Sequence, residues 1–421
     1  MTARAGRAQT NTGIAAVDSA NAARGAWARA VGELQRHDTA AARDDIARAA
    51  AAWPVQPAYL WASAVLSAHS GDVRGAIAAL DRYADLGLGR DLGIDSTFAA
   101  LRTLPGFAEL STRHDVNRQP IVRGRPRASL RDSTFWPEGM DIDPRNGRIY
   151  VASVRHRTVA VVDANGSTRE LWPRDRGDLS SVLGVRVDTA RNILWVTTSP
   201  VRASPDFTPG DTSSAILLRV RLGDGAVERR WLLPRGDHAL GDLAVGPHGD
   251  VFVTDSNDPV LYRLRPGADT LEAMRDARFR SLQGLAPSPD GRFLFLADYS
   301  HGLLRVDLEH GSVLRLDDAP HSTSLGCDGI AWDRGAIVAV QNGVTPARVM
   351  RFALDPTWSR IARADVLDQN WRVADEPTIG AVAGGQFVYV ANSQWEKFDA
   401  AGRRVSGKPL TAPQLLAIPL P

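Results

Sequence analysis

Residues 282–298 read Leu-Gln-Gly-Leu-Ala-Pro-Ser-Pro-Asp-Gly-Arg-Phe-Leu-Phe-Leu-Ala-Asp. A short apolar run follows the first Gly, a polar turn containing Asp-Gly comes next, and a strongly apolar run then ends in a small polar residue. Short apolar runs of this kind predict buried strands, and the Asp-Gly pair predicts a tight turn between them. The stretch therefore predicts a β-hairpin.

The same unit occurs six times. The copies are residues 137–153, 183–198, 241–255, 282–298, 327–342 and 378–392. Each copy continues into a third apolar run, and often into a fourth. Four short strands repeated about every 40 to 50 residues are typical of a propeller blade. We therefore expect a mainly β protein with a six-bladed β-propeller over residues 133–421. Either the segment before Glu138 or the tail, residues 414–420, is expected to close the ring.

The first part of the chain predicts helices instead. Ala dominates residues 15–87, and a shift of 34 residues aligns Trp27 with Trp61 and Asp38 with Asp72. This period is the signature of tetratricopeptide repeats, and both Asp residues stand where a helix N-cap is expected. The predicted organisation is a disordered N-terminus (1–14), a helical repeat domain (15–115), a linker (116–132) and the propeller. The helical domain could cover the propeller, or it could offer a groove to a protein partner.

Composition excludes several classes of protein. Lys and Arg number 50 against 48 Asp and Glu, without a concentrated basic face, so nucleic-acid binding is not expected. Cys327 is the only cysteine, so no internal disulfide or thiolate metal cluster can form. No apolar run approaches the ~20 residues of a membrane span. No signal peptide is visible, and the sequence leaves a cytoplasmic, periplasmic or secreted location open.

The predicted blade geometry gathers polar side chains at one mouth of the central channel. The start of an inner strand and the end of the next strand lie at the same face of the ring, because the two strands are antiparallel. Strand starts contribute Glu138, Asp242, Gln283 and Asp328, and strand ends contribute Asp255, Asp298, Asn342 and Asn392. Glu376 lies just ahead of the sixth inner strand.

Carboxylate and amide oxygens at one point suit a hard cation such as Ca²⁺, Mg²⁺ or Mn²⁺. The alternative is that the Asp residues only cap turns by accepting hydrogen bonds from local backbone N–H groups. Both alternatives are open for Asp255 and Asp298. For Glu138, Gln283 and Asp328 the channel is favoured, because each precedes a Gly.

Several short motifs resemble a known family. Pro-Glu-Gly-Met at 137–140, Ala-Asp-Tyr-Ser at 297–300 and Cys-Asp-Gly-Ile at 327–330, with the stretch quoted first, look like the senescence marker protein/gluconolactonase/LRE-like propellers and their strictosidine synthase-like and paraoxonase relatives. The resemblance implies one divalent cation at the channel mouth, calcium more than manganese, magnesium or zinc. The resemblance implies that Glu138 and Asp328 are ligands of this cation. Asp242 and Gln283 match the family's ligand positions less well, and Gln283 stands where the family has Asn.

Two functions follow from this sequence. The first is a metal-dependent hydrolase of a lactone or related ester, in which Asp328 or Asp242 is the general base and His301 could overhang the mouth as another. Its substrate would contact Asn342, Glu376, Asn392 and Asp298. The second is a non-catalytic scaffold of propeller and helical repeats that binds a protein or small-molecule partner. No Gly-x-Ser-x-Gly elbow with readable His and acid partners supports a serine hydrolase.

Overall fold

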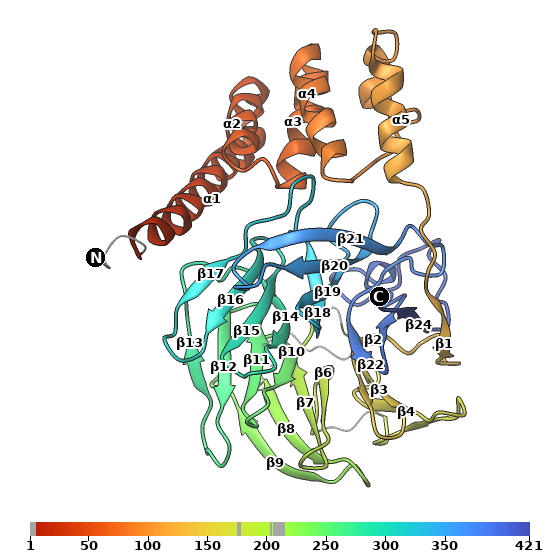
Figure 1. Cartoon of the computed structure of the whole chain (residues 1–421). Coiled ribbons are helices and arrows are strands. Elements are labelled where there is room, and N and C mark those ends of the chain that lie inside the picture. Colours follow the sequence, from red (N-terminus) through yellow and green to blue (C-terminus); the bar gives the residue numbers. More distant parts are fainter. Residues whose placement is uncertain (1–5, 175–177, 203, 205–214) are drawn as a thin grey trace. The chain divides into compact units, whose positions relative to one another are not determined.

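A computed structural model describes residues 6–174, 178–202, 204 and 215–421 of the chain. The chain divides into two compact units. The larger unit consists of residues 120–316, 326–343 and 347–421 and holds six four-stranded antiparallel sheets. The predicted six-bladed β-propeller is thereby confirmed, and the protein is mainly β (Figure 1).

Five blades are built from four consecutive strands each. They are β2 (Pro137–Asp143), β3 (Arg148–Ser153), β4 (Val159–Val162) and β5 (Thr168–Glu170); β6 (Ser181–Asp188), β7 (Ile193–Ser199), β8 (Ile216–Arg221) and β9 (Val227–Leu232); β10 (Leu240–Val245), β11 (Val251–Asp255), β12 (Val260–Leu264) and β13 (Glu272–Met274); β14 (Leu282–Pro287), β15 (Phe293–Asp298), β16 (Gly302–Asp307) and β17 (Val313–Arg315); and β18 (Cys327–Asp333), β19 (Ala336–Gln341), β20 (Arg348–Leu354) and β21 (Ile361–Gln369).

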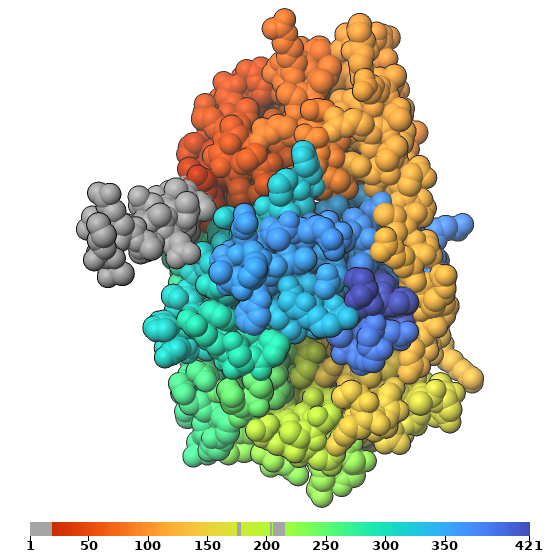
Figure 2. All heavy atoms as spheres, viewed as in Figure 1, coloured from red at the N-terminus to blue at the C-terminus, as the bar shows by residue number. Residues whose placement is uncertain are grey.

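The sixth blade joins both ends of the propeller sequence. Its order is β22 (Gly380–Ala383), β23 (Gln386–Val390), β24 (Gln414–Pro419) and β1 (Arg125–Ser129). Figure 2 shows the deep blue C-terminal residues beside the light-orange segment that leads into the first blade. The ring is therefore closed by the segment before Glu138 and by the tail together. The predicted linker 116–132 contains strand β1, so only part of it is a connection.

Glycines let the inner strands lie unusually close together. The inner strands β2, β6, β10, β14, β18 and β22 are neighbours in this order, and β22 lies next to β2. A Cβ atom on Gly139 would lie 2.2 Å from the carbonyl oxygen of Leu183, and one on Gly329 would lie 2.5 Å from the Cα of Ile379. Real Cβ atoms do not approach backbone this closely. The glycines thus set the spacing at the channel.

The smaller unit holds residues 1–119 together with 317–325 and 344–346. Its helices are α1 (Gly6–Gln35), α2 (Thr39–Ala52), α3 (Pro57–His69), α4 (Val73–Asp85), the 3₁₀ helix η1 (Ser96–Leu101) and α5 (Phe107–Asn117). α1 pairs with α2, and α3 pairs with α4, which agrees with two predicted helix pairs. α1 begins within the stretch 1–14 for which the sequence predicts disorder, and residues 1–5 lie outside the described residues.

The predicted N-caps of the helical unit are present. The side chain of Asp38 accepts a hydrogen bond from Ala41 N at 3.1 Å, and that of Asp72 accepts one from Gly75 N at 3.0 Å. Each satisfies a backbone donor that the first helical turn leaves free. No helix in the described part of the chain is both long and apolar enough to cross a membrane.

The glycine contacts give a stability prediction. Gly329→Ala should lower the free energy of unfolding by about 1–3 kcal/mol, because the added Cβ has no room beside Ile379. Gly223→Ala is the matched control, since nothing lies within 4 Å of a Cβ there and its effect should stay within about 0.5 kcal/mol. Urea unfolding followed by tryptophan fluorescence measures both, and equal effects would contradict the close packing of the inner strands.

Candidate functional site

The candidate site is formed by residues near the starts of the inner strands. In five of these strands a β-bulge positions the residues. Five inner strands shift register against their second strands at one equivalent place. The shifts lie between Pro137 and Met140, Val182 and Val185, Leu240 and Leu243, Leu282 and Leu285, and Cys327 and Ile330. Each bulge holds two residues, so Glu138, Gln283 and Asp328 occupy the same position in their blades, one residue before Gly.

Asp242 differs from these three residues by one position. In β10 the bulge holds Gly241 and then Asp242, so Asp242 stands where the other four bulged strands have Gly. Its Oδ1 lies 3.5 Å from Nη2 of Arg186, whose Nη1 lies 3.5 Å from Asp141 Oδ1. Arg186 is largely buried and bridges acids of the first and third blades. Asp242 therefore has a cationic partner inside the channel.

Glu138 is a half-buried carboxylate held by a neutral donor. Nε1 of Trp395 donates a hydrogen bond of 2.6 Å to its Oε2. Burial raises the pKa of Glu138 well above its usual value, and the charges of Asp328, Glu376 and Asp242 raise it further, against the effect of the Trp395 hydrogen bond. Within the described residues no ion pair or hydrogen bond reaches its Oε1. A negative charge on Glu138 is thus poorly compensated.

Asp328 is held in the same way. Nδ2 of Asn342 donates to Asp328 Oδ2 at 2.8 Å and also lies 2.9 Å from the carbonyl oxygen of Pro377. Burial raises the pKa of Asp328 to about 7, and Asp242 raises it too, while the Asn342 hydrogen bond acts in the opposite direction. Asn342 Oδ1 is buried without a hydrogen-bond partner. This pair therefore offers acceptor oxygens that lack donors.

Glu376 and Gln283 complete the acidic entrance. Glu376 is partly exposed, and its Oε1 accepts a hydrogen bond from the backbone N–H of Glu396 at 2.9 Å. Burial, and then the neighbouring acids Glu396 and Asp375, raise its pKa to about 7. Gln283 is half-buried, and its Nε2 lies 3.4 Å from Ser281 Oγ. Its amide oxygen is thus the end of the side chain left for another ligand.

Asp255 and Asp298 cap turns, as the alternative reading of the sequence expects. Asp255 accepts hydrogen bonds from the backbone N–H groups of Ala239, Asn257 and Asp258 and from His238 Nδ1. Asp298 accepts them from the backbone N–H groups of Arg280, Ser281 and Ser300. Both side chains are fully buried. Asp298 is therefore not available to a substrate.

Two other predicted residues are also occupied elsewhere. His301 is 1% exposed in the turn between β15 and β16, so its imidazole is enclosed by the protein. Asn392 donates to Thr411 Oγ1 at 3.0 Å and accepts from the backbone N–H of Gln414 at 2.7 Å. Asn392 thus ties β23 to the tail of the chain and has no donor or acceptor pointed at the site.

Sequence reasoning missed Trp395, Arg186 and Tyr299. Arg186 carries a signal, because a charged residue interrupts the apolar inner strand Ser181–Asp188. Tyr299 is 37% exposed, and burial together with Asp328 and Cys327 raises its pKa to about 12, so its phenol stays protonated. Trp395 lies in a long connection after β23, and no repeat position points to it.

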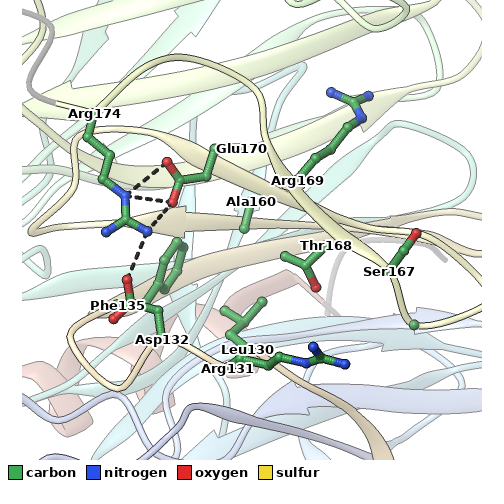
Figure 3. A pocket seen from close by; sticks show the side chains of 11 residues that line it. Leu130, Arg131, Asp132, Phe135, Ala160, Ser167, Thr168, Arg169, Glu170 and Arg174 are labelled. Atoms are coloured by element: carbon green, nitrogen blue, oxygen red, sulfur yellow. Dashed lines mark hydrogen bonds and ion pairs between the residues drawn. The ribbon is translucent and has the colours of Figure 1, made fainter.

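A cavity in the propeller is lined by residues other than these acids. It has a volume of about 450 Å³ and lies between Leu130–Phe135 and strand β5 (Figure 3). Arg174 forms ion pairs with Glu170 at 2.6 Å and with Asp132 at 2.8 Å there. The pKa of Asp132 is held at about 2, although burial acts to raise it, because Thr134 and Arg174 hydrogen-bond to the carboxylate. Both acids that line this cavity are therefore already paired with Arg174.

Whether the entrance fits a metal depends on its donors. The described residues contain no group of three or more His, Cys, Asp and Glu side chains arranged to hold an ion. The site instead has two carboxylates with neutral hydrogen-bond donors, Glu138 and Asp328, and buried acceptors without partners at Asn342 Oδ1 and Asp242 Oδ2. Such a set fits a hard cation bound by mixed carboxylate and amide oxygens, with water as further ligand.

Comparison with known proteins finds similarity only at the level of structure. No protein-family model matches the chain, and no curated protein matches its sequence. A gluconolactonase from Xanthomonas campestris is 17% identical with a TM-score of 0.45, over 69% of this chain and 89% of its own. Regucalcin from Agrobacterium tumefaciens, a calcium-binding protein, is 14% identical with a TM-score of 0.47, over 69% of this chain and 93% of its own.

A third similar structure is virginiamycin B lyase from Staphylococcus aureus. It is 15% identical with a TM-score of 0.44, over 64% of this chain and 80% of its own. Because the proteins named differ in activity, the likeness assigns neither a reaction nor a ligand to this chain.

The raised pKa values predict how stability depends on pH. The folded protein keeps Asp328 and Glu376 protonated up to about pH 7, whereas the unfolded chain loses these protons near their ordinary pKa values. Without divalent cations the folded form binds more protons over this window, so stability should fall as pH rises from about 4 to about 7. Thermal melts of Asp328→Asn should show a shallower fall. An unchanged slope in this variant would contradict the raised pKa of Asp328.

Proposed function

We propose that this protein is a divalent-cation-dependent hydrolase of a lactone or related ester, with its reaction centre at the entrance of the propeller channel. The observation that carries the proposal is the pair Glu138 and Asp328. Each carboxylate is oriented by one neutral donor and, in the described part of the chain, has no cationic partner. Buried like charges without compensation are costly unless they are protonated or a cation neutralises them.

Glu138 and Asp328 would hold the cation, together with the amide oxygens of Gln283 and Asn342. Asp242, the third acid predicted as a ligand, is less suited, because it stands one position later in its bulge and faces Arg186. These ligands are hard oxygen donors, which favours Ca²⁺ and leaves Mn²⁺ and Mg²⁺ possible. The chemistry that a bound cation supplies here is stabilisation of the negative charge that develops on the substrate carbonyl oxygen.

Glu376 is the best-placed proton acceptor among the acids. Asp328 is proposed as a cation ligand, and the oxygen of Asp242 that has no hydrogen-bond partner is buried. Glu376 is partly exposed, and only one of its carboxylate oxygens accepts a hydrogen bond. A pKa near 7 suits a group that must both accept and return a proton at neutral pH. Glu376 therefore replaces Asp328, Asp242 and His301 as the proposed general base.

The proposed reaction balances with water alone. The oxygen of a water molecule forms a bond to the carbonyl carbon, and Glu376 accepts the proton that this water loses. The ring C–O bond then breaks, and Glu376 returns the proton to the departing oxygen, which gives the open hydroxy acid. Tyr299, with its protonated phenol near Asp328, is available as a neutral hydrogen-bond donor to the substrate.

A protein partner for the helical unit is a separate proposal. Its exposed large apolar residues are Val31, Leu34, Val73, Ile94 and Val116. They belong to α1, α4, α5 and the segment before η1, so they do not mark one docking face by themselves. The alternative function, a non-catalytic scaffold, would instead be supported if the channel entrance bound no cation.

Cation binding and catalysis can be separated by three variants. Ca²⁺ should raise the melting temperature by several degrees, because it binds only the folded form, and Glu138→Gln and Asp328→Asn should abolish this rise. Glu376→Gln should keep the rise but lower δ-valerolactone hydrolysis at least about 100-fold. Differential scanning calorimetry and a pH-stat assay measure the two effects.

The control for these variants is Glu228→Gln, which removes an exposed carboxylate paired with Arg219 at the surface. It should leave both the Ca²⁺-linked rise and the hydrolysis unchanged. If no divalent cation raises the melting temperature of the unaltered protein, the proposed hydrolase is refuted. If Ca²⁺ binds but no lactone or ester is turned over, the site is a structural or sensory cation site.

A further inference from the structure

The connection between β23 and β24, residues 391–413, reaches the acidic entrance with two adjacent residues. We name this connection the mouth segment. The indole N–H of Trp395 donates to Glu138, and the backbone N–H of Glu396 donates to Glu376. One segment thus holds both a proposed cation ligand and the proposed base, each through a single hydrogen bond to one carboxylate oxygen.

Gln394 fixes the mouth segment immediately before Trp395. Its side chain is 1% exposed, its Nε2 donates to the carbonyl oxygens of Ser133 and Phe135 at 3.1 Å, and its Oε1 accepts from the backbone N–H of Thr411 at 2.9 Å. Its φ of 75° is left-handed, which is costly for a residue other than glycine. Three hydrogen bonds compensate this strained conformation, and the direction in which Trp395 leaves the chain is thereby fixed.

Packing fixes the ring of Trp395 as well. Trp136, which is fully buried, meets it edge-on with ring centres 4.7 Å apart, and Trp136 stacks on Phe398 of the same segment at 4.4 Å. Leu183 belongs to the same apolar cluster and occupies in β6 the bulge position that Glu138 holds in β2. The Trp395 ring therefore has little freedom to turn its N–H away from Glu138.

The far end of the mouth segment is also attached. Nζ of Lys397 donates to Thr411 Oγ1 at 3.1 Å, and Nδ2 of Asn392 donates to the same oxygen at 3.0 Å. Thr411 is thus bonded to the segment's beginning through both its backbone and its hydroxyl. A loop closed on itself in this way behaves as a rigid element of the entrance.

From these contacts we propose that Trp395 is a positioning residue, whose indole N–H occupies Oε2 of Glu138 and thereby presents Oε1 to the cation. The proposal rests on the proposed function, since it concerns the affinity of the cation that Glu138 would hold. Hydrogen bonds to a ligating carboxylate fix its orientation, and their loss typically lowers metal affinity about 10–100-fold. The competing explanation is that Trp395 is a packing residue whose N–H simply finds the nearest acceptor.

Isothermal titration of the full chain with Ca²⁺ distinguishes the two explanations. Trp395→Phe keeps an aromatic ring against Trp136 but removes the N–H donor, so it should weaken Ca²⁺ binding about 10-fold. Its melting temperature without Ca²⁺ should stay within about 2 °C of the unaltered protein. Trp231→Phe is the matched control, because the indole N–H of Trp231 in the outer strand β9 is also buried without a partner, and its Ca²⁺ affinity should be unchanged.

The outcomes separate this inference from the proposed function. If the unaltered protein binds Ca²⁺ and Trp395→Phe binds it equally well, the positioning role is overturned while the hydrolase stands. If both tryptophan variants lose affinity equally, the loss does not come from the N–H of Trp395, which also overturns it. If the unaltered protein binds no Ca²⁺, Mn²⁺ or Mg²⁺, both proposals fall together. Weaker binding in Trp395→Phe alone supports the inference, even where no ester is hydrolysed.

Discussion

Uncompensated negative charge at the channel entrance is the constraint on which the account of this protein depends. Glu138 and Asp328 come from different blades, and burial raises the pKa of both carboxyl groups. The charge of Asp328 raises the pKa of Glu138 further, and the charge of Asp242 raises the pKa of Asp328. Their hydrogen-bond donors are an indole and an amide, which orient a carboxylate without neutralising it. By contrast, Asp143 in the same inner strand as Glu138 is paired with Arg145, and Asp255 caps a turn.

The fold creates this situation through the repetition of one local feature. The same bulge in five inner strands gives each blade one residue at the entrance, directly before a glycine in four of them. Because the glycines bring neighbouring inner strands close together, side chains from different blades are forced near one another. Leu183 and Gly241 at two of these positions make one side of the entrance uncharged, and the mouth segment adds Trp395 there.

Much of the fold could be predicted because the sequence repeats the same structural units. Six copies of one hairpin predict six blades, and a 34-residue shift predicts two helix pairs with Asp38 and Asp72 as caps. Ring closure could not be decided, since β1 is short and polar and only its pairing with β24 makes it a strand. The same reasoning placed Glu138 and Asp328 correctly at equivalent bulges.

The errors at the site have a common physical origin. A one-residue difference in register, as between Glu138 and Asp242, cannot be seen in a motif but changes which neighbours a side chain meets. Turn-capping acids such as Asp298 look like site residues in sequence, because both follow strand ends. Trp395 could not be found in this way, since its contact with Glu138 joins residues far apart in the chain through the long connection 391–413.

The most direct test of the central claim is the number of protons that cation binding displaces. Buried acids that stay protonated near neutral pH must release protons when a cation binds between them. Titration calorimetry with Ca²⁺ at about pH 6.5, in buffers of different ionisation enthalpy, counts these protons. The account predicts release of about one proton or more per bound ion. Binding without proton release would contradict it, because Glu138 and Asp328 would then already be ionised and compensated.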